Sequence, residues 1–239
     1  MSNIEIVELV NIPIKKRTVI TGFAGAGFIG NTALMHAARV KGFTQVGHLR
    51  GNMMPALMLL VEGKPRHSFR IYTDASDDFM FLVTDSMFSA EPAWTIGQEL
   101  VAWLRKKGLK EIVALESFPF AQKGTFGFTT GDKNLQSYGV QPITEGAISG
   151  VNASLLDEAI KEGVEWTTIF VPTRIISSID YLGASEAIQV INTMFKLGVD
   201  AEDLRRMSEA VTRASAAYQR QQQKRGGFLD RILPGETGN

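Results

Sequence analysis

Residues 17–30 read RTVITGFAGAGFIG, and this stretch decides the fold class that the sequence predicts. Its first half, RTVITG, is a short β-branched run that ends in glycine, which predicts a strand. From Phe28 to Val40, apolar residues recur at helical intervals and predict a helix. The sequence therefore predicts an α/β fold that opens with a strand, a glycine-rich turn and a helix.

The turn itself, GAGFIG at residues 25–30, matches the G-x-G-x-x-G pattern of dinucleotide-binding sites. In such a site, Gly25, Gly27 and Gly30 would let the backbone approach a phosphate at the helix N-terminus. The acid that usually binds the ribose about 20 residues later is missing, because residues 49–51 read LRG. Arg50 would instead suit a 2′-phosphate, which leaves NADP open.

The alternative is that these glycines allow only a sharp turn and close packing of the helix on the sheet. A dinucleotide-binding half continues as strand, helix and strand, whereas the second strand here runs on into expected hairpins. The sequence favours this packing interpretation and predicts no bound cofactor. If a phosphate does bind, Gly25, Gly27 and Gly30 are the predicted ligands.

Further strands are predicted by short apolar segments, and further helices by longer segments with helical periodicity. The expected strands are residues 45–49, 56–61, 69–73, 79–84, 111–115 and 166–171, and the expected helices are residues 92–107, 152–161 and 184–197. A turn at residues 62–65 predicts a hairpin, and the close spacing of these strands predicts a partly antiparallel sheet. The glycine-rich residues 123–131 are expected to be loop with at most one more strand.

Residues 201–225 favour one long helix, followed by a tail at residues 226–239 that is predicted to be disordered. Apolar residues on this helix alternate at intervals of three and four, the spacing of a seam between helices; they are Leu204, Met207, Val211, Ala214 and Tyr218. The seam would either pair with another helix or pack on the chain's own domain. The expected domains are thus residues 1–200, the helix 201–225 and the tail 226–239.

The same helix carries a local excess of positive charge. Between Arg205 and Arg225 there are six basic residues and one acid, Glu209. This pattern is typical of a solvated helix face, and the alternative is a surface that docks an acidic partner.

Composition limits the other classes of function. The 239 residues are 44% hydrophobic, enough for one main domain with a full core, and 25 basic residues balance 25 acidic ones. Nucleic acid and anionic membranes are therefore not favoured as partners. The lack of cysteine excludes disulfides and thiolate metal sites, and the N-terminal residues do not resemble a signal peptide, so we expect a cytoplasmic protein.

Few residues are candidates for catalysis. His36, His48 and His67 are the only histidines, and no two are spaced as metal ligands on a helix would be. Asp85 and Glu116 each follow an expected buried strand, at the strand ends where open α/β sheets bind ligands. Either would serve as a general base, although capping of a helix or turn is the commoner role for such acids.

Several segments together resemble a known family: GFAGAGFIGNTA at residues 22–33, VGHLRGNMMPA at 46–56 and EGKPRHSFRIY at 62–72, with Pro55, Gly63 and Pro65 at characteristic places. The chain resembles the archaeal branch of the proteasome assembly chaperone family over roughly residues 19–197. The resemblance implies a Rossmann-like, three-layer α/β sandwich of phosphorylase type with a mixed sheet. It also implies a homo-oligomer without chemistry of its own.

Well-known members of that family hold proteasome subunits through a C-terminal tripeptide of a hydrophobic residue, tyrosine and any residue. This chain ends Thr237-Gly238-Asn239, so the tripeptide is absent. We therefore expect a non-enzymatic chaperone-like or scaffold protein that acts through protein contacts, with proteasome subunits among its possible partners. The alternative is a nucleotide- or nucleoside-binding enzyme that uses the glycine turn, with Asp85 or Glu116 as its base.

Overall fold

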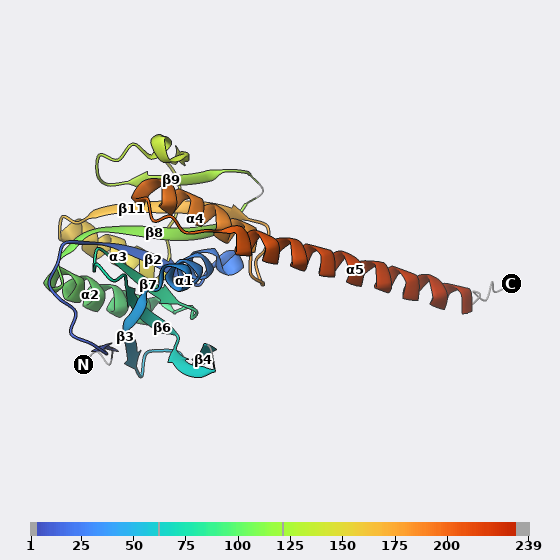
Figure 1. The fold of residues 1–239 in the computed structure, drawn as a ribbon, viewed down its shortest axis with the longest axis horizontal. Helices are drawn as coiled ribbons and strands as arrows, with labels where there is room; N and C mark the ends of the chain where they lie inside the picture. Colours follow the sequence, from blue (N-terminus) through green and yellow to red (C-terminus); the bar gives the residue numbers. More distant parts are fainter. Residues whose placement is uncertain (1–3, 62, 121, 233–239) are drawn as a thin grey trace.

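The computed structural model describes residues 4–61, 63–120 and 122–232, and it forms a nine-stranded sheet with helices on both faces (Figure 1). In space the strands run β1-β3-β6-β7-β2-β8-β11-β9-β10, and β4 and β5 form a separate hairpin. Their bounds are β1 Ile4–Glu8, β2 Arg17–Phe23, β3 Thr44–Gly51, β4 Met58–Val61, β5 Lys64–His67, β6 Phe69–Thr73, β7 Phe79–Thr84, β8 Leu109–Pro119, β9 Thr125–Thr129, β10 Val140–Pro142 and β11 Glu165–Thr173.

The sheet is mixed, as predicted. Its centre, β7-β2-β8-β11, is parallel, whereas β1, β3, β6 and β7 pair antiparallel along one side. On the other side β9 is antiparallel to β11 and parallel to β10. The central strands are buried over most of their length without alternation, because helices cover both of their faces.

Four helices make the outer layers: α1 Ile29–Lys41, α2 Ala90–Lys106, α3 Gly150–Lys161 and α4 Tyr181–Phe195. Apolar side chains of α1 and α4 share one core with one face of the sheet. Those of α2 and α3 share a second core on the opposite face. Two short 3₁₀ helices, η1 Ala26–Phe28 and η2 Leu135–Tyr138, lie in the connections. This confirms the three-layer α/β fold.

Helix α1 approaches the sheet unusually closely, and two glycines make this possible. A Cβ atom on Gly22 of β2 would lie 2.3 Å from the carbonyl oxygen of Gly30 in α1. A Cβ atom on Gly30 would lie 2.6 Å from the carbonyl oxygen of Leu115 in β8. Both distances are shorter than any side chain tolerates, so the packing interpretation accounts for Gly22 and Gly30.

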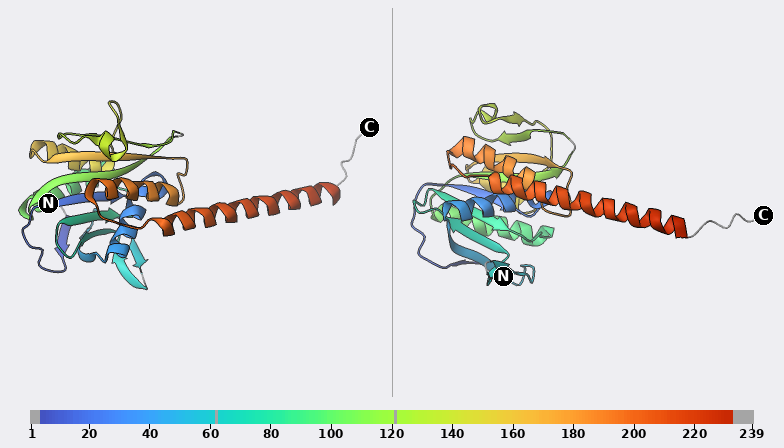
Figure 2. Two further views of the ribbon diagram at one scale, coloured as in Figure 1. Left: turned by 45° about the horizontal axis from the view of Figure 1, so that its top comes forward. Right: turned by 45° about the vertical axis from the view of Figure 1, so that its right-hand side comes forward.

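The last helix, α5 Glu202–Ile232, leaves the domain and projects into solvent (Figures 1 and 2). It continues through Gly226 and ends at Ile232, beyond the end at Arg225 that the sequence suggested, so residues 226–232 are helical rather than disordered. A glycine costs a helix only about 1 kcal/mol, which a helix that is already nucleated tolerates. Residues 233–239 of the predicted tail lie outside the described residues.

Strand β1 and strand β10 were not predicted from the sequence. Both are short strands at the edges of the sheet. They form by hydrogen bonding to β3 and β9, and such pairing cannot be predicted from a local sequence pattern. Across residues 4–61, 63–120 and 122–232, no helix has the length and apolar content that crossing a bilayer requires.

A substitution that adds one methyl group between β2 and α1 tests how much the stability of the fold depends on their close contact. We expect Gly22→Ala to destabilise the protein by about 3 kcal/mol or more, because backbone rather than a flexible side chain must move. Gly146→Ala is the matched control, since its Cβ would have its nearest neighbour at 3.8 Å. Urea unfolding of both variants measures the difference; equal midpoints would contradict the argument.

Candidate functional site

The parallel strands β2, β8 and β11 end at one edge of the sheet, and the glycine turn lies there. After β2 the chain passes through α1 to β3, on the β1 side of the sheet. After β8 it passes to β9, on the β10 side of the sheet. Divergence of this kind opens the crevice in which α/β sheets bind ligands. Gly25 stands at this point, since a Cβ on it would lie 3.0 Å from Ser117 Oγ at the end of β8.

Part of the glycine turn needs a left-handed backbone. Gly27 has φ of 65° and Phe28 has φ of 49°, and the N–H of Phe28 donates to the carbonyl of Gly25 at 3.0 Å. The carbonyl of Gly27 accepts the N–H of Asp180 at 2.8 Å. The segment between β11 and α4 therefore closes over the turn, and a Cβ on Gly27 would lie 2.9 Å from Asp180 Cβ.

Asp180 is held firmly in this position, where it caps α4. Its Oδ1 accepts the N–H of Gly183 at 2.9 Å, and its Oδ2 accepts the hydroxyl of Thr173 at 2.6 Å. The residue is 9% exposed. An acidic side chain thus packs directly against the middle glycine of the turn.

Glu116, one of the two acids singled out in the sequence, lies at the end of β8 in a polar chain beneath α3. Its Oε1 accepts Asn152 Nδ2 at 2.6 Å, and Asn152 Oδ1 accepts the Thr21 hydroxyl at 2.9 Å. Part of the Glu116 residue reaches solvent, but protein atoms enclose its carboxyl. This burial raises the pKa of Glu116 to about 7, and the hydrogen bond from Asn152 opposes it only weakly.

Asp85, the other acid, follows β7 and belongs to a different cluster. Its Oδ2 accepts Arg70 Nη2 at 2.5 Å, and its Oδ1 accepts Asn31 Nδ2 of α1 at 3.0 Å. Arg70 is 1% exposed, so Asp85 neutralises a buried cation. Asp85 contacts α1 and Glu116 contacts α3, and these helices cover opposite faces of the sheet. The structure does not bring the two acids together as an acid–base pair.

These charges bear on the predicted phosphate site. Asn31 lies in the first turn of α1, so Asp85 already places a carboxylate where the helix dipole favours an anion. Asp180 adds a second carboxylate at Gly27. Asp85 is compensated by Arg70, so Asp180 is the carboxylate that would oppose a phosphate beside Gly27. Binding at Gly25, Gly27 and Gly30 stays a prediction, and the electrostatics around them oppose it.

The histidines form no metal centre. His48 of β3 and His67 of β5 stack at 3.9 Å, with planes 9° apart, an arrangement that sequence spacing could not reveal. Burial, reinforced by His67 and Arg50, lowers the pKa of His48. His36 Nε2 lies 2.6 Å from the carbonyl of Asp200. Within the described part of the chain, no three His, Asp or Glu side chains are grouped to hold a metal ion.

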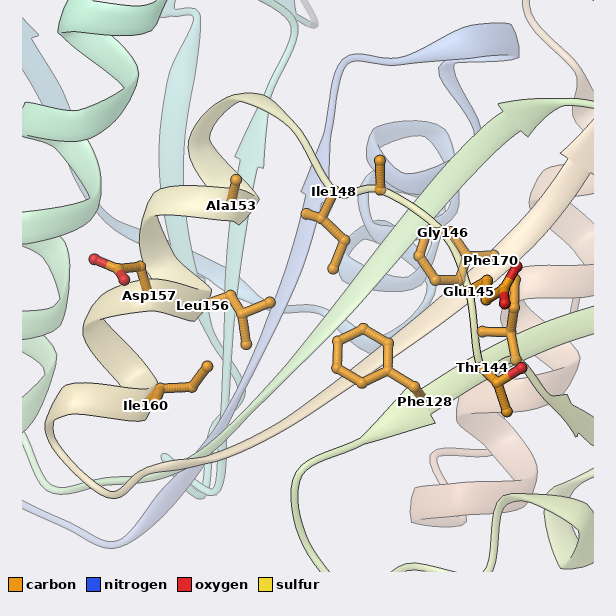
Figure 3. A pocket seen from close by; sticks show the side chains of 12 residues that line it. Phe128, Thr144, Glu145, Gly146, Ile148, Ala153, Leu156, Asp157, Ile160 and Phe170 are labelled. Atoms are coloured by element: carbon orange, nitrogen blue, oxygen red, sulfur yellow. The ribbon is translucent and has the colours of Figure 1, made fainter.

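A pocket of about 470 Å³, which we call the α3 pocket, lies between α3, β9, β11 and residues 143–148 (Figure 3). The side chains of Phe128, Ile148 and Leu156 point toward its centre, and Asp157 points away from it (Figure 3). Its walls are mostly apolar. The sequence analysis missed this pocket because its residues come from segments that are distant in sequence.

The pKa of Glu116 makes stability depend on pH. Between pH 4.5 and about 7, the Glu116 carboxyl keeps its proton in the folded chain but loses it in the unfolded chain. The free energy of unfolding therefore falls as the pH rises through this range. We expect Glu116→Gln to gain up to about 3 kcal/mol over the wild type between pH 5 and pH 8. Urea unfolding at both values measures it. Glu145→Gln, on an exposed segment, is the control, and parallel profiles for Glu116→Gln and wild type would refute the assignment.

Comparisons with known proteins place this geometry in context. A family model described as the PAC2 family matches residues 19–218. An uncharacterized protein of Methanocaldococcus jannaschii is 24% identical over 215 residues, covering 88% of this chain and 89% of that protein.

Solved structures agree on the fold. Pyrococcus furiosus PbaA, described as an archaeal homolog of proteasome-assembly chaperone, has a TM-score of 0.86 at 21% identity, over 97% of this chain and 98% of that one. Pyrococcus furiosus PbaB, described as an archaeal proteasome activator, has a TM-score of 0.77 at 16% identity, over 92% and 100%. The matched region includes the glycine turn, the whole sheet from β2 onward and the start of α5, so this chain belongs to the PAC2 family.

Proposed function

We propose that this protein is a non-enzymatic, chaperone-like scaffold that acts as a homo-oligomer and binds other proteins, with proteasome subunits as the first partners to test. The observation that carries the proposal is the projecting helix α5, whose apolar stripe the domain leaves uncovered. Membership of the PAC2 family supports it, as does the similarity in fold to PbaA, an archaeal homolog of proteasome-assembly chaperone, and to PbaB, an archaeal proteasome activator.

Only the beginning of α5 packs on the domain. Leu204 is 2% exposed and belongs to the core shared by α1 and α4. Farther along the same stripe, Met207 is 41%, Val211 51% and Tyr218 63% exposed. The seam predicted from the sequence is therefore split, since its first residue packs on the domain and the later ones face outward.

A helix of 31 residues is about 46 Å long. In proteins, most of a helix's stability comes from packing an apolar face, and an isolated helix in water is only marginally stable. A stripe of apolar side chains on a projecting helix is the usual form of a surface that lies in another protein's groove. The exposed stripe thus favours a protein partner over a small-molecule reaction.

The basic residues on the first half of α5 are paired with acids of the same helix. In the part of α5 with described side chains, Arg205 pairs with Glu202 at 3.7 Å, and Arg206 with Asp203 at 2.8 Å. Arg213 lies 3.4 Å from Glu209. These pairs support a solvated helix face, the interpretation that the sequence pattern favoured. Apolar contact along the stripe is therefore the binding mode we propose.

A charge placed on the stripe should weaken association. We expect Val211→Glu to lower the mean molecular mass of the oligomer at micromolar concentration, measured by light scattering and sedimentation velocity, and to reduce capture of purified proteasome α subunits. Ala217→Glu is the matched control, because Ala217 lies about 120° around the helix from Val211 and is also exposed.

A wild-type protein that is monomeric at micromolar concentration and captures no proteasome subunit would remove the proposal. Oligomers that survive Val211→Glu, with capture also unchanged, would keep the scaffold role but exclude the stripe as its contact surface.

The nucleotide alternative has its own test. We expect no change in the melting temperature of the protein with NADP or ATP, because Asp85 lies at the N-terminus of α1 and Asp180 packs against Gly27, where a phosphate would bind. Adenosine, which has no phosphate, tests the nucleoside form of the alternative. A bound ligand at about 100 times its dissociation constant would stabilise the fold by about 2.7 kcal/mol, well within detection by thermal shift. A clear shift with any of the three would favour a nucleotide-binding enzyme.

A further inference from the structure

The β4–β5 hairpin stands outside the nine-stranded sheet, and its two strands pair only with each other (Figure 1). A two-stranded hairpin by itself is at best marginally stable in water. Two of its apolar side chains are largely uncovered, since Met58 is 54% and Leu60 is 80% exposed. The position of the hairpin therefore depends on a few contacts with the domain.

Three contacts attach the hairpin to the domain. The ring of His67 in β5 stacks on the ring of His48 in β3, with centroids 3.9 Å apart and planes 9° apart. Arg70 Nη1 of β6 donates to the carbonyl of His67 at 3.1 Å. Val61 of β4 lines a cavity of about 590 Å³ beside α1, together with Met35. Two of these contacts involve His67, the residue at which β5 ends.

The histidine stack is poorly placed to carry charge. His48 is 8% exposed, and burial, His67 and Arg50 each lower the pKa of His48, with burial the largest cause. Two charged imidazole rings at the observed separation would repel each other strongly, because little water lies between them to screen the charges. The closed hairpin therefore holds at most one proton on this pair of rings.

The charged groups in the surrounding strands do not offset a second proton. They form two cation–acid pairs with further cations beside them: Arg50 with Glu5 at 2.8 Å, Arg70 with Asp85 at 2.5 Å, and Lys64 and Arg66 of β5. Arg70 lies opposite His48 where β3 pairs with β6. Glu5 favours a proton on His48, but more weakly than Arg50 opposes it. Both acids already have a cation as partner.

Opening of the hairpin would change how many protons the two rings bind. In the open form both imidazoles lie in water, where each has the ordinary histidine pKa of about 6.5. Below that pH the open form binds more protons than the closed form, so proton linkage shifts the equilibrium toward the open form. Acid thus acts on the contact between β5 and β3.

We propose that the β4–β5 hairpin is an acid-sensitive flap, which opens from β3 when the stacked rings of His48 and His67 take up a second proton. Its opening withdraws Val61 and so removes one wall of the cavity beside α1. The flap acts independently of the proposed scaffold function, because it involves the hairpin and not the stripe on α5.

Amide hydrogen exchange, corrected for the intrinsic effect of pH on exchange rates, measures this opening. We expect the equilibrium constant for opening at amides of β4 and β5 to rise about tenfold from pH 7.5 to pH 5.5, the factor for one proton on an ordinary histidine. Amides of β2, at the centre of the sheet, report unfolding of the whole domain and should not show this rise. No rise in the hairpin, or an equal rise in β2, would overturn the proposal.

Variants assign the effect to the stack. Combining His48→Phe with His67→Phe keeps two stacked rings but removes both titrating groups, and the opening constant should then change less than about twofold over the same pH range. His36→Gln removes the remaining histidine, on α1, and should keep the tenfold rise of the wild type. A tenfold rise in the phenylalanine pair would contradict the assignment.

A measurement on the wild type decides the question if the phenylalanine pair does not fold. An NMR titration follows the ring protons of His48 and His67 from pH 8 to pH 5.5. We expect at most one of the two rings to gain a proton while the hairpin amides stay protected. Two protonated rings in a protein whose hairpin is still closed would refute the proposal.

Discussion

The close approach of Gly22 in β2 to Gly30 in α1 is the contact on which the rest of the candidate site depends. It brings the first turn of α1 down onto the ends of β2 and β8, where a helix with ordinary side chains would stand farther away. From this position Asn31 reaches Asp85 and Gly27 meets Asp180. Gly30, the last glycine of a pattern associated with phosphate binding, here serves helix-to-sheet packing, and Asp180 packs against Gly27.

The acids at this edge have structural partners that limit their chemistry. Asp85 neutralises Arg70, a cation that is 1% exposed, and Asp180 caps α4. Burial of the Glu116 carboxyl, without a cation beside it, raises its pKa to about 7. This carboxyl lies beneath α3 with Asn152, away from Asp85. Asp85 and Glu116 therefore do not form a proton-transfer pair.

Helix α5 combines two environments along one stripe. Its first turn is anchored in the core through Leu204, and Met207 lines a cavity of about 590 Å³ beside α1. The next two turns of α5 still border α4, since Ser208 and Thr212 line a pocket with Leu182. Farther out the helix projects from the domain (Figure 2), and Tyr218 on the stripe is exposed.

The sequence by itself determined the α/β class, the positions of the central strands and the family, because β-branched runs, helical periodicity and the spacing of glycines are local properties. It predicted only residues 111–115 of β8, which spans Leu109–Pro119. It located β6 and β7 to the residue and proposed both roles for the glycine turn. Tertiary structure alone shows the packing role, since only the distance from Gly22 to Gly30 shows that a side chain has no room; ligand binding at the turn stays a prediction. It also decided which acids have partners, that His48 stacks on His67, and that α5 leaves the domain. These contacts join segments that are far apart in the chain, and a local sequence pattern does not predict which distant segments come into contact.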